Sequence, residues 1–349
     1  FSSLGLSSHL LHALAKQHYT DPYPIQKEAI PAILSGKDVL GVAPTGSGKT
    51  ASFALPILQQ FQKKPVAKNR FIKALILVPT RELAVQVGDV FTMFAAQLPR
   101  AVKILSVFGG VSINTQMIHL QGVELLVATP GRLLDLIDSK ALNISEIDIL
   151  VIDEADKMLN LGFKAEMTSI FSLLPIQRQN LLFSATLGKE INTITEILLQ
   201  NPVKIEVKED LKHIDLIQQI AYDVAEERKG PMLRYLIQEK NMQQVLVFTS
   251  SIHRADAVVE KLKTHGISAA AMHSKKSQGA RTDALKNFKL GAVKVLVATD
   301  LASRGFDIDA LPFVINYELP RSPKDYIHRI GRTGRAASSG TAISLIGPD

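Results

Sequence analysis

Short runs of aliphatic and β-branched residues alternate with longer segments of helical periodicity from one end of this 349-residue chain to the other. This alternation is typical of βαβ units, in which helices join parallel strands. Because a strand of a parallel sheet is buried on both faces, its sequence is a continuous apolar run and not an alternating one. The pattern therefore predicts an α/β protein built on mostly parallel sheets flanked by helices.

The predicted strands fall into two groups separated by a polar stretch. A helix ends before Pro202, one short strand-like run follows, and mixed charges continue to Asp215. The length also favours about two domains. We therefore expect a first domain over residues 1–207, a linker over 208–215 and a second domain over 216–349. The predicted strands are 38–42, 74–78, 104–108, 125–129, 149–153 and 180–184 in the first domain, and 244–248, 267–272, 293–299, 313–317 and 341–346 in the second.

Composition excludes several kinds of site. The chain has no cysteine, which excludes thiol nucleophiles, disulfides, iron–sulfur clusters and cysteine-ligated zinc. The longest apolar runs are far shorter than the roughly 20 residues of a membrane span. The first ten residues do not resemble a signal peptide, so we expect no membrane association and a cytoplasmic location. The net charge of +7 favours a polyanionic partner such as nucleic acid without requiring one.

The first chemical motif directly follows the predicted strand at 38–42. The residues from Ala43 to Thr50 are APTGSGKT and precede a helix-competent segment, which is the context of a phosphate-binding P-loop. We expect Lys49 to hold the β- and γ-phosphates and Thr50 to ligate Mg²⁺. Ala43 departs from the glycine of the pattern, and the alternative is a glycine-rich surface turn with an incidental lysine. The other loop residues expected around the phosphates are Thr45, Gly46, Ser47 and Gly48.

A P-loop requires an acidic partner at the end of a neighbouring strand. The apolar run 147–152 ends in Asp153 and Glu154, followed by Ala155 and Asp156. We expect Asp153 to face Mg²⁺, largely through its waters, and Glu154 to polarise the attacking water. The alternative is an acidic cap on the next helix, because carboxylates favour first turns.

Residues 153–156 spell DEAD, and essentially the whole chain resembles the DEAD-box RNA helicases of superfamily 2. The detail of QRQNLLFSAT, KSQGART and NYELP is similar to the bacterial RhlE-type subgroup. The resemblance implies two RecA-like domains joined by a short linker, with ATP and Mg²⁺ in the cleft and RNA across both. It implies RNA-stimulated ATP hydrolysis coupled to domain closure and local unwinding of RNA duplexes. The motifs stand in the family's order at 19–26, 43–50, 79–83, 109–110, 129–132, 153–156, 184–186, 278–281, 298–307 and 328–335.

The resemblance assigns further residues to the nucleotide. Gln26 is expected to read the adenine edge and Phe1 to stack on the ring, although a terminal phenylalanine also packs simply on its own domain. Arg332 and Arg335 are expected to act as arginine fingers on the γ-phosphate. The alternative for these two arginines is a solvated basic stripe. Tyr19, Gly305 and Asp307 complete the expected nucleotide contacts.

Coupling and RNA binding are also implied by the resemblance. The hydroxyls of Ser184 and Thr186 are expected to bond the DEAD carboxylates, including Asp156, although they can equally cap the next helix. His328 is expected to link the arginine loop to these carboxylates. RNA contacts of this kind reach phosphate and 2′-OH groups and carry little sequence information. The expected RNA contacts are Thr80, Arg81, Gly109, Gly110, Thr129, Pro130, Gly131, Arg132, Gln278, Arg281, Thr299 and Asp300.

Three residues depart from the family's pattern. His18 stands where the Q motif begins with glycine, Tyr23 replaces a small hydroxyl residue, and Ser274 replaces a glycine.

Two other functions are alternatives to an RNA helicase. They are a DNA translocase on the same two domains and a non-enzymatic, ATP-dependent RNA clamp. We expect a monomeric core, with ribosome-assembly or RNA-decay factors as possible protein partners.

Overall fold

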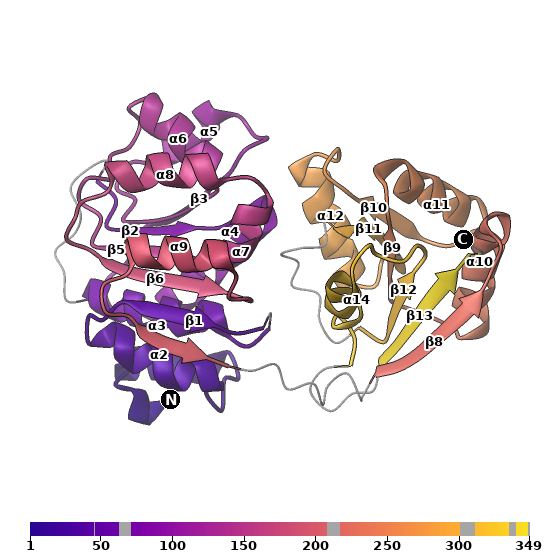
Figure 1. Ribbon diagram of the computed structural model, residues 1–349, viewed down its shortest axis with the longest axis horizontal. Helices are drawn as coiled ribbons and strands as arrows, with labels where there is room; N and C mark the ends of the chain where they lie inside the picture. Colours follow the sequence, from indigo (N-terminus) through magenta and orange to yellow (C-terminus); the bar gives the residue numbers. More distant parts are fainter. Residues whose placement is uncertain (45, 63–70, 208–216, 301–310, 335–339, 348–349) are drawn as a thin grey trace. The chain divides into compact units, whose positions relative to one another are not determined.

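The computed structural model describes residues 1–44, 46–62, 71–207, 217–300, 311–334 and 340–347. It divides into two compact units, Phe1–Glu209 and Asp210–Asp349 (Figure 1). The predicted linker, 208–215, lies outside the described residues, so its bounds stay a prediction. No helix in the described ranges is long and apolar enough to cross a membrane.

The first unit contains a seven-stranded sheet in the order β3-β4-β2-β5-β6-β1-β7, in which every described pair is parallel. Most of these strands are four-residue apolar runs buried on both faces, as the sequence predicts for a parallel sheet. The short run after Pro202 forms the edge strand β7. The strands are β1 (Val39–Val42), β2 (Ala74–Leu77), β3 (Ile104–Val107), β4 (Leu125–Ala128), β5 (Ile149–Ile152), β6 (Gln179–Ser184) and β7 (Val203–Glu206).

Helices cover both faces of this sheet (Figure 1). One face packs against α1 (Ser8–Lys16), α2 (Pro24–Leu34), α3 (Lys49–Gln62) and α4 (Arg81–Ala95). The other face packs against α5 (Ile113–His119), α6 (Pro130–Asp138), α7 (Ala155–Asn160), α8 (Lys164–Leu173) and α9 (Lys189–Leu198). The result is a three-layer α/β unit with two apolar cores separated by the sheet.

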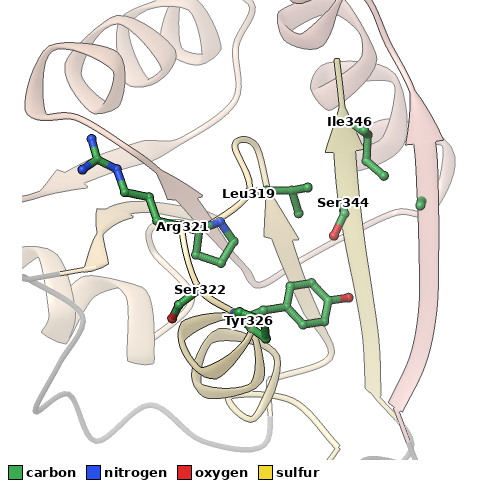
Figure 2. Close-up of a pocket in the computed structure, with 9 residues that line it drawn as sticks. Leu319, Arg321, Ser322, Tyr326, Ser344 and Ile346 are labelled. Carbon is green, nitrogen blue, oxygen red and sulfur yellow. The ribbon is translucent and has the colours of Figure 1, made fainter. Parts of the chain in front are cut away.

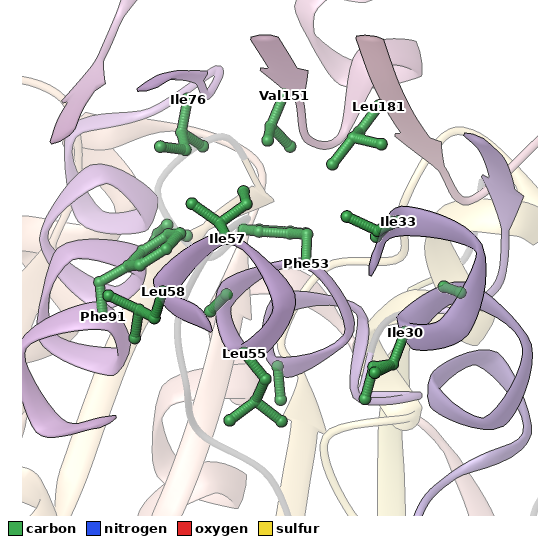
Figure 3. Packing of buried hydrophobic residues seen from close by; sticks show 14 of the residues in the cluster. Ile30, Ile33, Phe53, Leu55, Ile57, Leu58, Ile76, Phe91, Val151 and Leu181 are labelled. Atoms are coloured by element: carbon green, nitrogen blue, oxygen red, sulfur yellow. The ribbon is translucent and has the colours of Figure 1, made fainter. Parts of the chain in front are cut away.

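Helix α3 lies at the centre of the first core. Figure 3 shows Phe53 and Ile57 of α3 beneath Ile76, Val151 and Leu181, which come from three neighbouring strands. Phe53 and Ile57 are fully buried, and burying a side chain of this size contributes about 2 kcal/mol. This packing fixes the N-terminus of α3, and therefore the phosphate loop before it, against the end of the sheet.

The second unit repeats the pattern with six parallel strands in the order β10-β11-β9-β12-β13-β8. Helices α10 (Lys229–Glu239) and α11 (Ile252–Thr264) cover one face, and α12 (Gln278–Lys289) and α14 (Pro323–Ile330) cover the other. The strands are β8 (Ile217–Asp223), β9 (Val245–Thr249), β10 (Ala269–Met272), β11 (Val295–Thr299), β12 (Phe313–Asn316) and β13 (Gly340–Ile346).

The sequence analysis did not predict strand β8. Its residues, IQQIAYD, include two glutamines and are mostly exposed or half-buried, because β8 is the outermost strand of the sheet. A polar edge strand lacks the continuous apolar run that identifies a central one. The other predicted strands are present within a residue or two, and the prediction of two mostly parallel α/β sheets flanked by helices is confirmed.

A pocket of about 390 Å³ opens beside this edge of the second unit. In Figure 2 the side chain of Leu319 and the ring of Tyr326 extend towards β13, from which Ser344 and Ile346 line the same pocket. None of the residues that line it was predicted to bind nucleotide or RNA.

Candidate functional site at the carboxyl edge of the first sheet

Three neighbouring strands of the first unit end in the predicted ATP motifs. The order β5-β6-β1 places the residues after β5, which begin with Asp153, beside Ser184 at the end of β6 and the phosphate loop after β1. All three strands are parallel, so their carboxyl ends meet at one edge of the sheet. The topology thus brings together motifs more than 100 residues apart in sequence.

The phosphate loop has the backbone conformation that its glycines allow. Gly46 and Gly48 have φ values of +81° and +86°, in the left-handed region that other residues rarely adopt. Ala43, by contrast, continues β1, because its N–H donates to the carbonyl of Ser184 at 3.1 Å. The first position of the motif therefore requires no glycine in this chain, which explains why alanine is tolerated there.

Lys49 is the first residue of α3 and is buried beneath the loop. Its Nζ donates to the carbonyl oxygens of Ala43 at 2.6 Å and Pro44 at 3.0 Å. Burial lowers the pKa of Lys49, while the negative charges of Asp153 and Glu154 oppose that shift. The ammonium of Lys49 and the carboxylates of Asp153 and Glu154 therefore influence one another's charge.

Asp153 is a buried carboxylate at the end of β5. Its exposed fraction is 2%, and its Oδ1 accepts a hydrogen bond from the N–H of Glu154 at 2.9 Å. Burial, followed by the charge of Glu154, raises the pKa of Asp153 to about 6, against the lowering effect of Lys49. Ionising this buried carboxylate is costly without a further positive charge. A bound cation would supply that charge.

Glu154 is held by a neighbouring cation. It lies in the left-handed region, with φ of +53°, and its Oε1 accepts from Nζ of Lys157 at 2.6 Å. Both side chains are buried. Its other oxygen, Oε2, is buried and has no hydrogen-bond partner in the described part of the chain. One oxygen of Glu154 is therefore fixed and the other is available.

The predicted coupling residues are in contact. Thr186 Oγ1 donates to Oδ2 of Asp156 at 3.0 Å, so this hydroxyl bonds a DEAD carboxylate as expected. Ser184 differs, because its hydroxyl donates to the carbonyl of Thr186 at 2.8 Å and not to a carboxylate. Ser184 thus shapes the turn that presents Thr186 to Asp156.

Gln26 of α2 touches the phosphate loop directly. Its Nε2 donates to the carbonyl of Gly48 at 3.1 Å, and its Oε1 accepts from the N–H of Tyr23 at 2.9 Å. The side chain is fully buried. The amide predicted to read adenine therefore also ties α2 to the loop, and a side chain at Gly48 would collide with it.

The backbone at His18 explains why the family's pattern has a glycine at this position. His18 has φ of +59°, a conformation that favours glycine and is strained for other residues. The rings of Phe1 and Tyr19 meet edge to face at 6.5 Å, and Tyr19 meets Phe94 of α4 at 5.7 Å. Phe1 therefore packs on its own unit through Tyr19, and its stacking on adenine stays a prediction.

The predicted RNA residues of the first unit share the other half of the edge. Strands β3, β4 and β2 are neighbours, and Gly109, Thr129 and Thr80 follow their carboxyl ends. Thr80 caps α4, its Oγ1 accepting from the N–H of Leu83 at 3.3 Å. Gly131 has no atom near the position where a Cβ would lie, so the backbone is open there. The remaining members of this group are Arg81, Gly110, Pro130 and Arg132.

Two arginines of this group make contacts within the protein. Arg132 is buried and donates to Oε1 of Gln116 at 2.9 Å, to the carbonyl of Val111 at 2.9 Å and to Asp135 at 3.3 Å. The Arg81 guanidinium lies directly against Gly110, where a Cβ would overlap it. Arg132 therefore holds the loop after β3, and this geometry favours an indirect role for it in any RNA contact.

The predicted RNA residues of the second unit lie after β10 and β11. Gln278 and Arg281 are in the first turn of α12, and Oε1 of Gln278 is buried without a partner among the described residues. Thr299 ends β11, and Asp300 follows it. Both oxygens of Asp300 accept from Arg329, at 2.6 and 2.7 Å. The Asp300 carboxylate thus positions the backbone that follows β11.

Arg329 and Lys157 are residues that the sequence reasoning missed. Arg329 is 2% exposed, also donates to Asn316 and to the carbonyl of Glu318, and lies 5.0 Å from the ring centre of Phe248. Its position inside the motif at 328–335 could have identified Arg329 from the sequence. For Lys157 the signal was its place in the first turn of α7, three residues after Glu154.

Several predicted residues cannot be placed. Thr45, Gly305, Asp307 and Arg335 lie outside the described residues. Arg332 follows α14 and is 8% exposed, its carbonyl accepting from the N–H of Leu311 at 3.0 Å, and His328 lies in the last turn of α14. In the described ranges no group of three or more His, Cys, Asp or Glu residues can hold a metal ion.

Comparison with known families identifies two matching profiles. The profile of the DEAD/DEAH box helicases matches residues 23–194, and that of the helicase conserved C-terminal domain matches residues 228–337. Curated relatives include the DEAD-box ATP-dependent RNA helicases CshA of Geobacillus kaustophilus, 38% identical, and of Bacillus subtilis, 39% identical. Both matches cover 100% of this chain, and 73% and 69% of those relatives. These relatives carry the name CshA, so the RhlE-type subgroup is not confirmed.

Solved structures share the fold. Dbp5 of S. cerevisiae bound to RNA and ADP BeF3 is 28% identical, with a TM-score of 0.85 over 100% of this chain and 90% of that chain. A DEAD box protein from Methanococcus jannaschii is 36% identical, with a TM-score of 0.57 over 99% of this chain and 93% of that chain. The expected RecA-like architecture is confirmed by these matches.

Replacing Asp153 by asparagine is expected to make stability less dependent on pH. The folded-state pKa of about 6 lies above the ordinary value of 3.8, so the contribution of Asp153 to stability is fully present below pH 3.8 and is lost as the pH rises through about 6. Asp153→Asn removes this loss. Urea unfolding without Mg²⁺ or nucleotide should show the variant gaining about 1 kcal/mol on the wild type between pH 5 and 7.5.

The matched control is Asp138→Asn, which changes an exposed carboxylate of the same unit. An Asp153→Asn stability difference that stays constant across this pH range would contradict the buried-carboxylate account.

Proposed function

The chain belongs to the DEAD-box ATP-dependent RNA helicases, and from this membership we propose that it binds ATP on the β5–β6–β1 half of the carboxyl edge and RNA on the β3–β4–β2 half. As a member of this family it is an RNA-dependent ATPase and helicase. The observation that carries the assignment of the ATP half is the burial of Lys49 beneath the phosphate loop, where the charges of Asp153 and Glu154 oppose the lowering of its pKa by burial. The RhlE-type subgroup stays a prediction.

The phosphate loop is proposed to hold the β- and γ-phosphates of ATP. Lys49 now donates to two backbone carbonyls, and a phosphate oxygen is a stronger, charged acceptor for the same ammonium. Gly46 and Gly48 leave the loop without side chains where the phosphates approach. Thr45, which lies outside the described residues, and Ser47 complete this loop.

The residues present fit Mg²⁺ bound together with ATP. Mg²⁺ is typically bound by one or two carboxylates together with substrate phosphates and waters, and not by an all-protein cage. Asp153 supplies a carboxylate whose burial raises its pKa, and Thr50 supplies a hydroxyl at the start of α3. When bound, Mg²⁺ neutralises charge on the phosphates and on Asp153.

Glu154 is proposed to orient and polarise the attacking water. Its Oε2 is buried and has no partner in the described chain, so it can accept a hydrogen bond from a water. Gln26 is proposed to read the adenine edge through the hydrogen-bonding capacity that its two protein contacts leave. Phe1 and Tyr19 are proposed to flank the base.

The second unit is proposed to complete the ATP site when the two units close. Arg332 and Arg335 would stabilise charge on the γ-phosphoryl group, His328 would link their loop to the DEAD carboxylates, and Gly305 and Asp307 would contact the nucleotide. Because hydrolysis then needs both units, each ligand that favours closure strengthens binding of the other by the same factor. The Thr186–Asp156 hydrogen bond joins the segments that follow β6 and β5, both within the ATP half.

RNA is proposed to lie across the ends of β3, β4 and β2 and the start of α12. These positions offer helix N-termini, open glycines and capping hydroxyls, which contact phosphate and 2′-OH groups without reading sequence. The relative Dbp5 binds RNA together with ADP BeF3, which supports the same pairing of ligands here. A cytoplasmic location, a monomeric core and ribosome-assembly or RNA-decay partners stay predictions.

RNA is expected to stimulate ATP hydrolysis far more than a DNA of the same sequence, because 2′-OH contacts distinguish the two. The measurement is the steady-state ATPase rate with matched RNA and DNA strands at saturation. Equal stimulation would favour the DNA translocase, and no phosphate release with saturating RNA would favour the non-enzymatic clamp.

Two substitutions are expected to act at different steps. Glu154→Gln should retain ATP and RNA binding but stop hydrolysis, so that RNA stays bound in the presence of ATP. Lys49→Ala should prevent formation of this complex, because it removes the phosphate contact. Fluorescence anisotropy of labelled RNA with ATP, and the ATPase rate, distinguish the two.

Lys27→Ala, which removes an exposed lysine on α2 of the same unit, is the control. If both site variants turned over ATP at the wild-type rate, the assignment of the site would be wrong.

A further inference from the structure

Lys157 is a buried cation to which the family resemblance assigned no role. It lies on α7, three residues after Glu154, and is 6% exposed. A lysine is almost never this buried unless it is paired. Among the described residues, its Nζ pairs with Oε1 of Glu154 at 2.6 Å.

Glu154 is the other member of this ion pair, and its position is tightly constrained. It is the residue immediately before α7, its backbone is left-handed, and the residue is 6% exposed. The ion pair with Lys157 engages only Oε1, one of the two carboxylate oxygens of Glu154. Since Oε2 is buried and unpartnered among the described residues, the ion pair leaves one defined acceptor free.

A second ammonium, that of Lys49, lies in the same cluster of charges. Lys49 interacts electrostatically with both Asp153 and Glu154, as well as with Lys157. Without Lys157, Glu154 would remain as a buried carboxylate near Lys49 alone, and rotation of its side chain could pair the two. That pairing would consume the carboxylate and the phosphate-binding ammonium together.

We propose that Lys157 is a positioning residue for ATP hydrolysis: it fixes Oε1 of Glu154, keeps Glu154 away from Lys49, and so directs Oε2 to the attacking water. The proposal rests on the proposed role of Glu154 in activating that water. Lys157 touches neither ATP nor water in this account and acts only through Glu154. The competing view is that Lys157 merely neutralises a buried charge and supports the fold.

A double-mutant cycle distinguishes these views. Lys157→Met and Lys157→Arg are made in the wild type and in Glu154→Gln, and ATP hydrolysis is followed at saturating RNA, with long single-turnover measurements for the slow variants. Lys157→Met should lower kcat by about tenfold to a hundredfold, as a misplaced catalytic group does, with the KM for ATP changed by less than about threefold. Lys157→Arg should restore most of kcat, because it keeps the cation.

In the Glu154→Gln background, Lys157→Met should cause no further loss, because the carboxylate on which it acts is gone. An equal fold-loss in both backgrounds, a wild-type kcat in Lys157→Met, or a higher kcat would overturn the proposal. If Glu154→Gln itself turned over ATP normally, the role of Glu154 would fail instead, which is a separate outcome.

Binding and folding controls keep the test decisive. The affinity of each variant for a fluorescent ADP analogue and its melting temperature are measured in parallel. If Lys157→Met does not fold, Lys157→Ala carries the test, since it too removes the group that fixes Oε1. A Lys157→Ala variant that folds and retains wild-type kcat would overturn the proposal.

Discussion

The parallel direction of every strand in the first sheet is the constraint on which the site depends. Parallel strands end at the same edge, so each connection that follows a strand begins there. The order β3-β4-β2-β5-β6-β1 then divides the edge into two halves. The phosphate loop and the DEAD carboxylates follow the strands of one half, and the residues proposed to bind RNA follow those of the other. Neither half needs residues that are close in sequence.

Within the ATP half, the structure concentrates buried charge. Lys49 and Lys157 face the carboxylates of Asp153, Glu154 and Asp156, so the cluster has one more carboxylate than it has ammonium groups. Burial, followed by the charge of Glu154, raises the pKa of Asp153 in this cluster. A divalent cation would offset the carboxylates, and the phosphates of ATP would offset the ammonium groups. Burial of these charges, which costs free energy in the free protein, can therefore favour ligand binding.

The sequence carried much of this arrangement, but not all of it. Central strands and the phosphate loop were predictable because continuous apolar runs and glycine spacing reflect local requirements. Strand β8 was missed because a polar edge strand lacks such a run. The partners of Arg132 and Asp300 were also not predictable, since Gln116 and Arg329 approach them only through tertiary packing. Gln26 illustrates both cases, because its motif was recognisable and its contact with Gly48 was not.

The most direct test of the two-half edge is hydrogen–deuterium exchange of the full chain with nucleotide alone and with nucleotide plus RNA. A non-hydrolysable ATP analogue should slow exchange in the segments after β1, β5 and β6, at 43–50, 153–157 and 184–186. Addition of RNA should then slow exchange after β2, β3 and β4, at 80–83, 109–112 and 129–132. Protection by RNA at the amino-terminal ends of these strands, with none at their carboxyl ends, would contradict the account.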